Sequence, residues 1–235
     1  MRPKYTSDLF NDIIRFVKLD NNKKVLEIGI GTGQATLPFL NTGCNITAIE
    51  LGKDLANFSQ RKFSRFKNIK IINSDFINFN DNEDTYDLIY SATALHWIPK
   101  EIGYPKVYNF LKSGGVLALF WNHPYPETAI QKIYDIYTPD FLKPKKLAID
   151  NEHCLSTIRT IKDYGFIKEE YKLYYSNRKL NAEQYIALMN TYSSHRSMEK
   201  DSKEILENGI IEAIKNNGNQ VIIYDTIDLY LSKKP

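Results

Sequence analysis

Glycines recur at alternate positions directly after a short apolar segment near the start of the chain. The segment Val25–Ile28 is apolar except for the acid Glu27. It is followed by Gly29, Gly31 and Gly33. An apolar segment this short is typical of a buried strand, and glycine lets the backbone turn and approach a ligand because it has no Cβ. With the partly positive start of a helix after the turn, the pattern predicts a site for a nucleotide-type cofactor.

The spacing of these glycines separates two kinds of cofactor. The dinucleotide fingerprint G-x-G-x-x-G would place its third glycine where this chain has Gln34. Here the third glycine comes one residue earlier, at Gly33. An NAD-dependent oxidoreductase is therefore disfavoured, and a glycine turn in some other α/β protein is the plainest alternative to a cofactor site.

Expected strands alternate with expected helices through the first half of the chain, with short connections between them. This alternation predicts a doubly wound, mostly parallel sheet of the α/β class. Ligands of such sheets lie beyond the carboxyl ends of the strands, near the point where the strand order reverses. Glu50, Asp75 and the segment 91–97 each follow an expected strand, as the glycines do. We therefore expect all of them to meet at one edge of the sheet. The expected strands cover residues 24–28, 45–49, 69–73, 86–90 and 116–121.

The alternation of expected strands and helices stops after Trp121. We therefore divide the chain into a core domain and the segments that follow it. Residues 1–122 form the expected cofactor-binding core. Segments 123–165 and 176–219 are mostly helical in pattern, and we expect them to form a lid that carries substrate residues. Segments 166–175 and 220–235 contain alternating, aromatic-rich strands, which are expected to close the core sheet as an antiparallel edge.

The composition excludes several classes of protein. The 235 residues carry a net charge of +3, from 31 basic and 28 acidic residues, which is too balanced to indicate nucleic acid binding. The two cysteines show no metal-ligand or disulfide spacing, so no metal site is expected. No apolar run is long enough for a membrane span, and the first residues do not have the pattern of a signal peptide, so a cytoplasmic location is expected.

Four stretches of the chain resemble motifs of one enzyme family. These are the glycine pattern with Glu27, the opening Arg2-Pro3-x-Tyr5, and the segments YDLIYSATALHWIP and LKSGGVLALFWN. Together they resemble the class I S-adenosylmethionine-dependent methyltransferases, in particular the small-molecule group that includes trans-aconitate methyltransferases. The resemblance implies a Rossmann-like seven-stranded sheet, S-adenosyl-L-methionine as cofactor and S-adenosyl-L-homocysteine as product.

The resemblance also implies roles for individual residues. Glu50 would bind both ribose hydroxyls and Asp75 the adenine amino group, whereas Glu27 would lie near the methionine end of the cofactor. Solvated strand ends and turn caps are the alternatives for Glu50 and Asp75. The implied cofactor-binding residues are Arg2, Tyr5, Glu27, Gly29, Gly31, Gly33, Glu50, Leu51, Asp75, Phe76, Ser91 and Ala92.

The acceptor is the least constrained part of the prediction. His96 is the candidate general base, because a histidine pKa can lie near the working pH; orienting the loop after the fourth strand is its alternative role. The segment Ser91–Ala94 lacks the N/D-P-P-Y/F motif of enzymes that methylate exocyclic base amines. The expected function is therefore methyl transfer to a small molecule such as a carboxylate, and not to nucleic acid. Methylation of RNA or protein, or binding without turnover, are the alternatives. The candidate substrate residues are Trp97, Trp121, Tyr192, His195 and Arg196.

Overall fold

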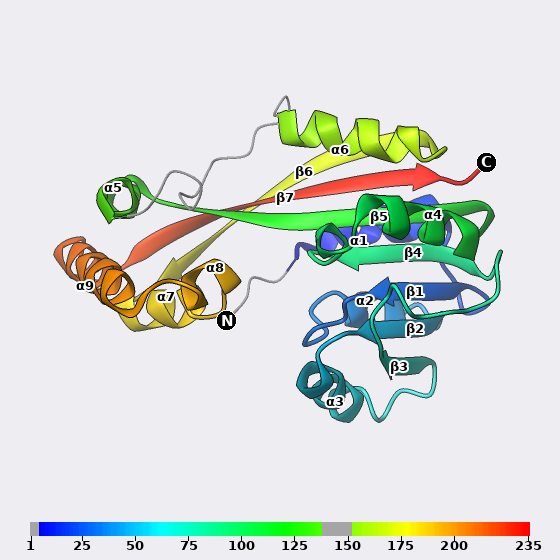
Figure 1. Cartoon of the computed structure of the whole chain (residues 1–235), viewed down its shortest axis with the longest axis horizontal. Coiled ribbons are helices and arrows are strands. Elements are labelled where there is room, and N and C mark those ends of the chain that lie inside the picture. The colour runs from blue at the N-terminus through cyan, green and yellow to red at the C-terminus, as the bar shows by residue number, and fades with distance from the viewer. Residues whose placement is uncertain (1–4, 138–151) are drawn as a thin grey trace. The chain divides into compact units, whose positions relative to one another are not determined.

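The computed structural model describes residues 5–137 and 152–235 and contains one seven-stranded sheet (Figure 1). The strand order is β3-β2-β1-β4-β5-β7-β6. The first five strands pair in parallel. The strand β7 runs antiparallel to them between β5 and β6, and β6 forms the edge of the sheet. The predicted α/β class with a mostly parallel, seven-stranded sheet is confirmed. The strands are β1 (Lys24–Ile28), β2 (Asn45–Glu50), β3 (Ile69–Asn73), β4 (Tyr86–Ala92), β5 (Leu111–Pro126), β6 (Ile167–Leu180) and β7 (Val221–Lys233).

The helices occur between these strands and in the later part of the chain. Within the described residues, no helix combines the length and the hydropathy needed to cross a bilayer. The helices are α1 (Ser7–Val17), α2 (Thr36–Leu40), α3 (Lys53–Lys62), the 3-10 turn η1 (Leu95–Trp97), α4 (Lys100–Phe110), α5 (Thr128–Tyr137), α6 (Glu152–Asp163), α7 (Ala182–Met189), α8 (Ser193–Arg196) and α9 (Lys200–Asn216).

The described chain forms two compact units. The sheet unit contains residues 5–121, 152–174 and 228–235, and the helical unit contains residues 122–137 and 175–227. Strands β5, β6 and β7 each begin in one unit and end in the other. The predicted lid segment 123–165 includes residues 138–151, which lie outside the described residues.

The strand order reverses between β1 and β4, and this reversal creates the position for a ligand. The chain runs outward from β1 through β2 to β3, then returns to place β4 on the other side of β1. Because parallel crossovers are right-handed, α2 and α3 lie on one face of the sheet and α4 on the other. The carboxyl ends of β1 and β4 diverge at this reversal, which is where doubly wound sheets bind their ligands.

Aromatic side chains fix α1 and α2 against the sheet. The ring of Phe10 on α1 lies 5.4 Å from that of Phe39 on α2, edge to face. Phe39 in turn lies 4.5 Å from Tyr90 on β4. All three side chains are buried, and burial of a large apolar side chain stabilises a fold by roughly 1.5–3 kcal/mol.

The helix α4 ends before the glycine pair that follows it. Glycine is a typical helix stop, but the structure ends α4 at Phe110 and not at Gly114 or Gly115. Leu111 is already extended, with φ −74° and ψ 138°, because it pairs with Tyr86 at the start of β4. The register then shifts, so that the next described pair is Leu88 with Val116. A strand partner therefore ends the helix before the glycines do.

The helical unit has a core of its own. Side chains from α5, α7, α9 and the start of β7 form one buried apolar cluster. Within this unit, the guanidinium of Arg178 makes two hydrogen bonds to the buried carboxylate of Asp225, at 2.5 and 3.0 Å. The side-chain amide of Asn122 donates to the same carboxylate over 2.8 Å. These three donors compensate the cost of burying a charge.

Candidate functional site

The glycine turn follows β1 and is tied to the end of β2 by its backbone N–H groups. The N–H groups of Gly29 and Ile30 both donate to the carbonyl of Ile49, at 2.9 and 3.2 Å. The N–H of Gly31 donates to Oε2 of Glu50 over 2.8 Å. The N–H of Gly33 donates to the carbonyl of Ile30 over 2.8 Å. Since phosphate-binding turns need unpaired N–H groups, this arrangement suits a cofactor without phosphate.

The three glycines have positive φ, and the space around them differs. A Cβ on Gly29 (φ +76°) would lie 2.4 Å from Cβ of Ala94, because the loop after β4 packs directly on this turn. A Cβ on Gly33 (φ +71°) would meet the ring of Phe63 at 2.3 Å. A Cβ on Gly31 (φ +56°) would meet no atom within 4 Å. The backbone at Gly31 therefore faces open space, as a cofactor that passes over the turn requires.

Glu50 lies at the carboxyl end of β2, as predicted. Its carboxylate accepts two backbone hydrogen bonds, from Gly31 at Oε2 and from Gly52 at Oε1, the second over 2.9 Å. A carboxylate has about four acceptor positions, so each oxygen keeps one for a ligand hydroxyl. The next residue, Leu51, is 72% exposed and presents an apolar surface beside this carboxylate. These residues fit a ribose and an adjoining flat ring.

Glu27 is a fully buried acid in the middle of β1. Its Oε2 accepts a 2.8 Å hydrogen bond from the hydroxyl of Thr36, the first residue of α2. Burial raises the pKa of Glu27 to about 7, although hydrogen bonds from Tyr90 and Thr36 oppose the rise. An acid held at this pKa is partly protonated at neutral pH. Perturbed acids of this kind are concentrated at functional sites.

Asp75 follows β3 and has both a structural partner and an available oxygen. Its Oδ1 accepts a 2.9 Å hydrogen bond from the N–H of Ile77, which is the turn-capping role. Among the described residues, Oδ2 has no hydrogen-bond partner. Phe76, by contrast, is buried, and its ring packs edge to face on Phe110 of α4 at 6.4 Å. Phe76 thus packs in the core beneath the loop that follows β3. The apolar side chain next to Asp75 at the surface is the exposed Ile77.

The end of β4 is occupied by bonds within the protein. The buried hydroxyl of Ser91 donates to the carbonyl of Ile28 over 3.2 Å and accepts from the N–H of Leu95 over 2.9 Å. Ala92 follows and is partly buried. Thr93 has φ +59°, a value that is rare for a β-branched residue. Its hydroxyl lies 3.0 Å from the hydroxyl of Tyr5. Tyr5 therefore reaches the cofactor edge, whereas Arg2 lies outside the described residues.

His96 and Trp97 form the turn η1 directly after this loop. The indole Nε1 of Trp121, on β5, donates to Nδ1 of His96 over 2.9 Å. Trp97 is 71% exposed, and its ring centroid lies 4.9 Å from that of His96. The structure thus brings together three predicted acceptor-site residues, His96, Trp97 and Trp121, in the sheet unit.

The remaining predicted substrate residues belong to the helical unit. His195 is only 5% exposed, and its Nε2 lies 2.8 Å from Oε1 of Glu207. This pairing gives His195 a structural partner within its own unit. Tyr192 is partly buried and Arg196 is exposed. Their predicted contact with substrate stays a prediction.

Sequence reasoning missed two residues of α3 that brace the glycine turn. The buried hydroxyl of Ser59 donates to the carbonyl of Gly31 over 2.6 Å. The ammonium of Lys62 donates to the carbonyls of Thr32 and Gly33, at 2.7 and 3.2 Å. In the sequence, Lys62 belongs to a basic run that a helix C-terminus explains. Only the spacing of three between Ser59 and Lys62, which puts them on one helix face, could have indicated this role.

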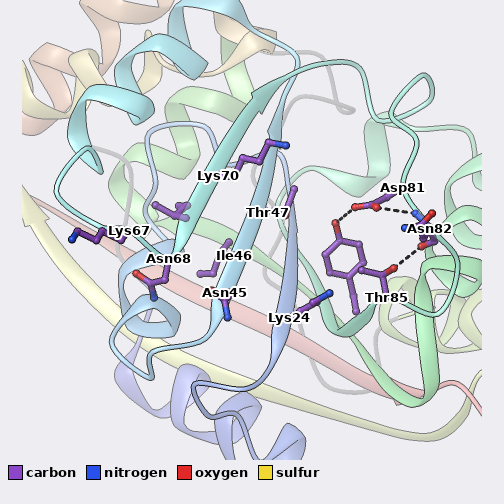
Figure 2. Close-up of a pocket in the computed structure, with 12 residues that line it drawn as sticks. Lys24, Asn45, Ile46, Thr47, Lys67, Asn68, Lys70, Asp81, Asn82 and Thr85 are labelled. Carbon is purple, nitrogen blue, oxygen red and sulfur yellow. Dashed lines mark hydrogen bonds between the residues drawn. The ribbon is translucent and has the colours of Figure 1, made fainter.

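A cavity of about 330 Å3 lies at the opposite edge of the sheet (Figure 2). Its lining comes from the amino ends of β1, β2 and β3 and from the loop before β4, and includes Lys24, Asn45, Lys70 and Asp81. The hydroxyl of Tyr86 donates to Asp81 over 2.6 Å within it. Because ligands of doubly wound sheets bind at the carboxyl ends, this cavity is separate from the cofactor site.

Comparison with known proteins identifies the family of enzyme. Residues 6–133, more than half of the chain, match the family model described as ribosomal RNA adenine dimethylase. An uncharacterized methyltransferase-like protein of Schizosaccharomyces pombe is 24% identical over 100% of this chain and 91% of its own length. An rRNA adenine N-6-methyltransferase of Bacteroides fragilis is 30% identical, over 55% of this chain and 48% of its own.

A solved structure supports the fold over the whole chain. The putative type II methyltransferase from Anaeromyxobacter dehalogenans matches with a TM-score of 0.71 at 15% identity, over 100% of this chain and 98% of that one. This structure confirms the predicted class I fold. The family match and the methyltransferase relatives confirm the predicted cofactor S-adenosylmethionine and the enzyme class, although the matching family is named for an RNA substrate. The protein is a methyltransferase and belongs to the ribosomal RNA adenine dimethylase family of S-adenosylmethionine-dependent enzymes.

Proposed function

We propose that the protein transfers the methyl group of S-adenosylmethionine to a small-molecule acceptor, with a carboxylate as the expected acceptor group. The cofactor supplies an electrophilic methyl group on a sulfonium, which reacts by in-line displacement. The protein has to align donor and acceptor and exclude water, and alignment alone can contribute roughly 7–11 kcal/mol. The expected cytoplasmic location is part of this proposal.

The cofactor is assigned to the carboxyl edge of β1, β2, β3 and β4. Glu50 would accept the ribose hydroxyls at its two remaining positions, and Oδ2 of Asp75 would accept the adenine amino group. Leu51 and the exposed Ile77 would border the adenine ring. Glu27, the glycines, Ala92 and Tyr5 would surround the methionine end. The predictions that segments 123–165 and 176–219 act as a lid, and that Tyr192 and Arg196 contact the acceptor, belong to this proposal.

The end of β4 is the observation that supports a small-molecule acceptor. A base amine needs a side-chain amide or carboxylate nearby that accepts its N–H groups. Here the only polar side chain in Ser91-Ala92 is the hydroxyl of Ser91, which already donates to Ile28 and accepts from Leu95. The hydroxyl of Thr93 pairs with that of Tyr5 over 3.0 Å, and Ala94 adds no polar side chain. This strand end therefore offers no side-chain amide or carboxylate for an exocyclic amine of adenine.

The extent of each match along the chain also favours a small-molecule acceptor. The rRNA methyltransferase of Bacteroides fragilis matches 55% of this chain, and the family model ends at residue 133. The methyltransferase-like protein of Schizosaccharomyces pombe matches the chain throughout. The match to the family named for ribosomal RNA thus covers residues 6–133, which include the proposed cofactor site, and does not extend to the later residues.

Methylation of RNA is the second candidate function. The family match favours it, because that family is named for ribosomal RNA. The balanced charge of the chain led us to expect no nucleic acid substrate, and this family match is evidence against that expectation. The two acceptor classes are separated by experiment.

The acceptor class is tested by labelling a cell extract with S-adenosylmethionine that carries an isotopically labelled methyl group. We expect label in a deproteinised small-molecule fraction, detected by mass spectrometry, and none in RNA. Label that is found in RNA and disappears on nuclease treatment would establish the second candidate instead. Binding of S-adenosylhomocysteine without label in any fraction would show a binding protein without turnover.

Alanine at Gly31 is expected to weaken cofactor binding, whereas alanine at Gly29 is expected to destabilise the fold. Gly31→Ala costs about 1–2 kcal/mol of backbone strain at φ +56° and places a methyl group in the open space. The variant should therefore fold but bind S-adenosylhomocysteine at least about tenfold more weakly. Gly29→Ala should instead lose most of its stability, because its Cβ would collide with Ala94. Thermal melting and calorimetric titration measure both; unchanged binding by folded Gly31→Ala would contradict the cofactor's position.

A further inference from the structure

A hydrogen bond between Trp121 and His96 fixes where the imidazole carries its proton. The indole N–H of Trp121 donates to Nδ1 of His96 over 2.9 Å. Because an indole nitrogen can only donate, Nδ1 must present its lone pair. A neutral imidazole carries one proton, so that proton lies on Nε2. The side chain of His96 is exposed, and Nε2 has no hydrogen-bond partner among the residues that the structure describes.

Trp121 is itself held in place. Its backbone N–H donates to Oδ1 of Asp228 over 3.0 Å, and Asp228 is fully buried. The hydroxyl of Tyr230 donates to the other oxygen of Asp228 over 2.9 Å. The indole packs against the ring of Tyr230 at 5.9 Å and an interplanar angle of 69°. The donor is thus fixed by β5 and β7, and it orients the imidazole rather than following it.

The imidazole extends from the loop that covers the glycine turn. Ala94, two residues before His96, occupies the space next to Gly29. The N–H of Leu95 is bound to the hydroxyl of Ser91. His96 therefore lies at the carboxyl edge of β4, at the end assigned to the methionine part of the cofactor, where the acceptor must approach.

The neutral form of His96 is favoured at neutral pH. Partial desolvation of the ring lowers the pKa of His96, and the nearby His153 of α6 lowers it further. A second proton on the ring would have to go to Nδ1, which would break the hydrogen bond from Trp121. The imidazole accordingly offers an N–H and no free lone pair on Nε2.

We propose that His96 donates a hydrogen bond from Nε2 to the methyl acceptor and does not act as a general base, with Trp121 as the positioning residue that fixes its tautomer. This inference rests on the proposed small-molecule function. It reverses the role expected for His96 from sequence. A site without a base requires an acceptor that is deprotonated on arrival, and among common groups this is an anionic oxygen such as a carboxylate.

The transfer to a carboxylate balances without a proton acceptor. A lone pair of one carboxylate oxygen forms the O–CH3 bond, the C–S bond of the sulfonium breaks, and its electron pair remains on sulfur. The products are a methyl ester and a neutral thioether, and no proton is released. The Nε2 N–H would bind the second oxygen, which leaves the lone pairs of the reacting oxygen available.

The tautomer is tested by NMR of protein labelled with 15N in its histidines, with His96→Gln to assign the signals. We expect the Nε2–H tautomer in the wild type across about pH 6 to 9. Trp121→Phe should raise the pKa of His96 and produce a mixture of tautomers. His153→Gln is the matched control, which should raise the pKa but leave the tautomer unchanged. A wild-type Nδ1–H tautomer, or a Trp121→Phe variant identical to the wild type, would overturn the proposal. This result does not depend on turnover, so it is independent of the acceptor's identity.

The role in transfer is tested on the product that the extract experiment yields. A methyl ester supports the proposal. An ether would overturn it, because an alcohol must lose a proton, and a methylated amine would overturn it, because its acceptor is not an anionic oxygen. On that acceptor, His96→Phe should lower kcat/KM by about 10- to 100-fold, and His96→Gln, which keeps an N–H donor, should recover most of the loss. The wild-type rate should be flat in the neutral pH range. A rate that rises through a pKa near that of histidine and is lost equally in both variants would show a general base.

Discussion

Replacing Glu50 by alanine is expected to weaken the binding of S-adenosylhomocysteine by about 100- to 1,000-fold. A hydrogen bond to a charged group contributes about 1.5–3 kcal/mol, and in the proposed site the carboxylate accepts two from the ribose. The change also removes the acceptor of the Gly31 and Gly52 N–H groups, which loosens the turn below the cofactor. Calorimetric titration measures the affinity, and a loss of about 3–4 kcal/mol corresponds to the stated range.

Controls separate binding from folding in this experiment. Glu101→Ala removes an exposed acid of α4 and should leave the affinity unchanged. Glu50→Gln keeps one acceptor oxygen and should lie between the wild type and Glu50→Ala. Circular dichroism and thermal melting establish that the variants are folded. An affinity for folded Glu50→Ala within about threefold of the wild type, less than 1 kcal/mol, would remove Glu50 from the ribose site.

Replacing Glu27 by glutamine is expected to stabilise the protein above neutral pH and to change little in acid. The pKa of this buried carboxyl is raised to about 7, so the folded state keeps a proton that the unfolded state releases near pH 4 to 5. Stability is therefore lost as the pH rises through this interval and is lowest above the folded pKa. The difference between the unfolded and folded pKa values corresponds to a loss of about 3 kcal/mol in the free energy of unfolding. Glutamine does not have this loss, because its side chain stays neutral.

The measurement is the melting temperature of the wild type and of Glu27→Gln between about pH 5 and about pH 8.5. At the upper limit the variant should melt about 5–10 °C higher than the wild type, since 1 kcal/mol corresponds to about 2–4 °C for a chain of this size. The amide can still accept from Thr36 and can donate to the hydroxyl of Tyr90. Glu101→Gln is the matched control and should follow the wild type. Parallel curves for the wild type and Glu27→Gln would mean that Glu27 does not take up this proton.

The sheet could be predicted from the sequence because its signals are local. Apolar segments marked β1, β2 and β3 to within one residue, and the polar residues after them marked the carboxyl edge. The ends of the later strands could not be found in this way. The strand β5 begins at Leu111 because Tyr86, 25 positions earlier, pairs with it. Strand length depends on such partners, which a local pattern does not contain.

The site was predictable where backbone geometry determines the residue type. The glycines of the turn after β1 adopt positive φ, which favours glycine. The acid at the end of β2, Glu50, accepts a hydrogen bond from an N–H group of this turn, and both features are visible in the sequence. Side-chain partners from distant segments were not predictable. Phe76 is buried because Phe110 of α4 reaches it, and His195 is paired because Glu207 lies on the next long helix. The tautomer of His96 depends on Trp121, a residue on another strand.

The closed set of hydrogen bonds around the glycine turn has a consequence for the kinetics of cofactor binding. Four backbone N–H groups of this turn and both carboxylate oxygens of Glu50 make hydrogen bonds within the protein. The entropy that an ordered side chain would lose on association, about 0.5–1.5 kcal/mol each, is therefore spent during folding. The cofactor should meet a rigid receptor and associate in a single kinetic phase whose rate rises linearly with its concentration, without the plateau that a slow rearrangement of the turn would impose.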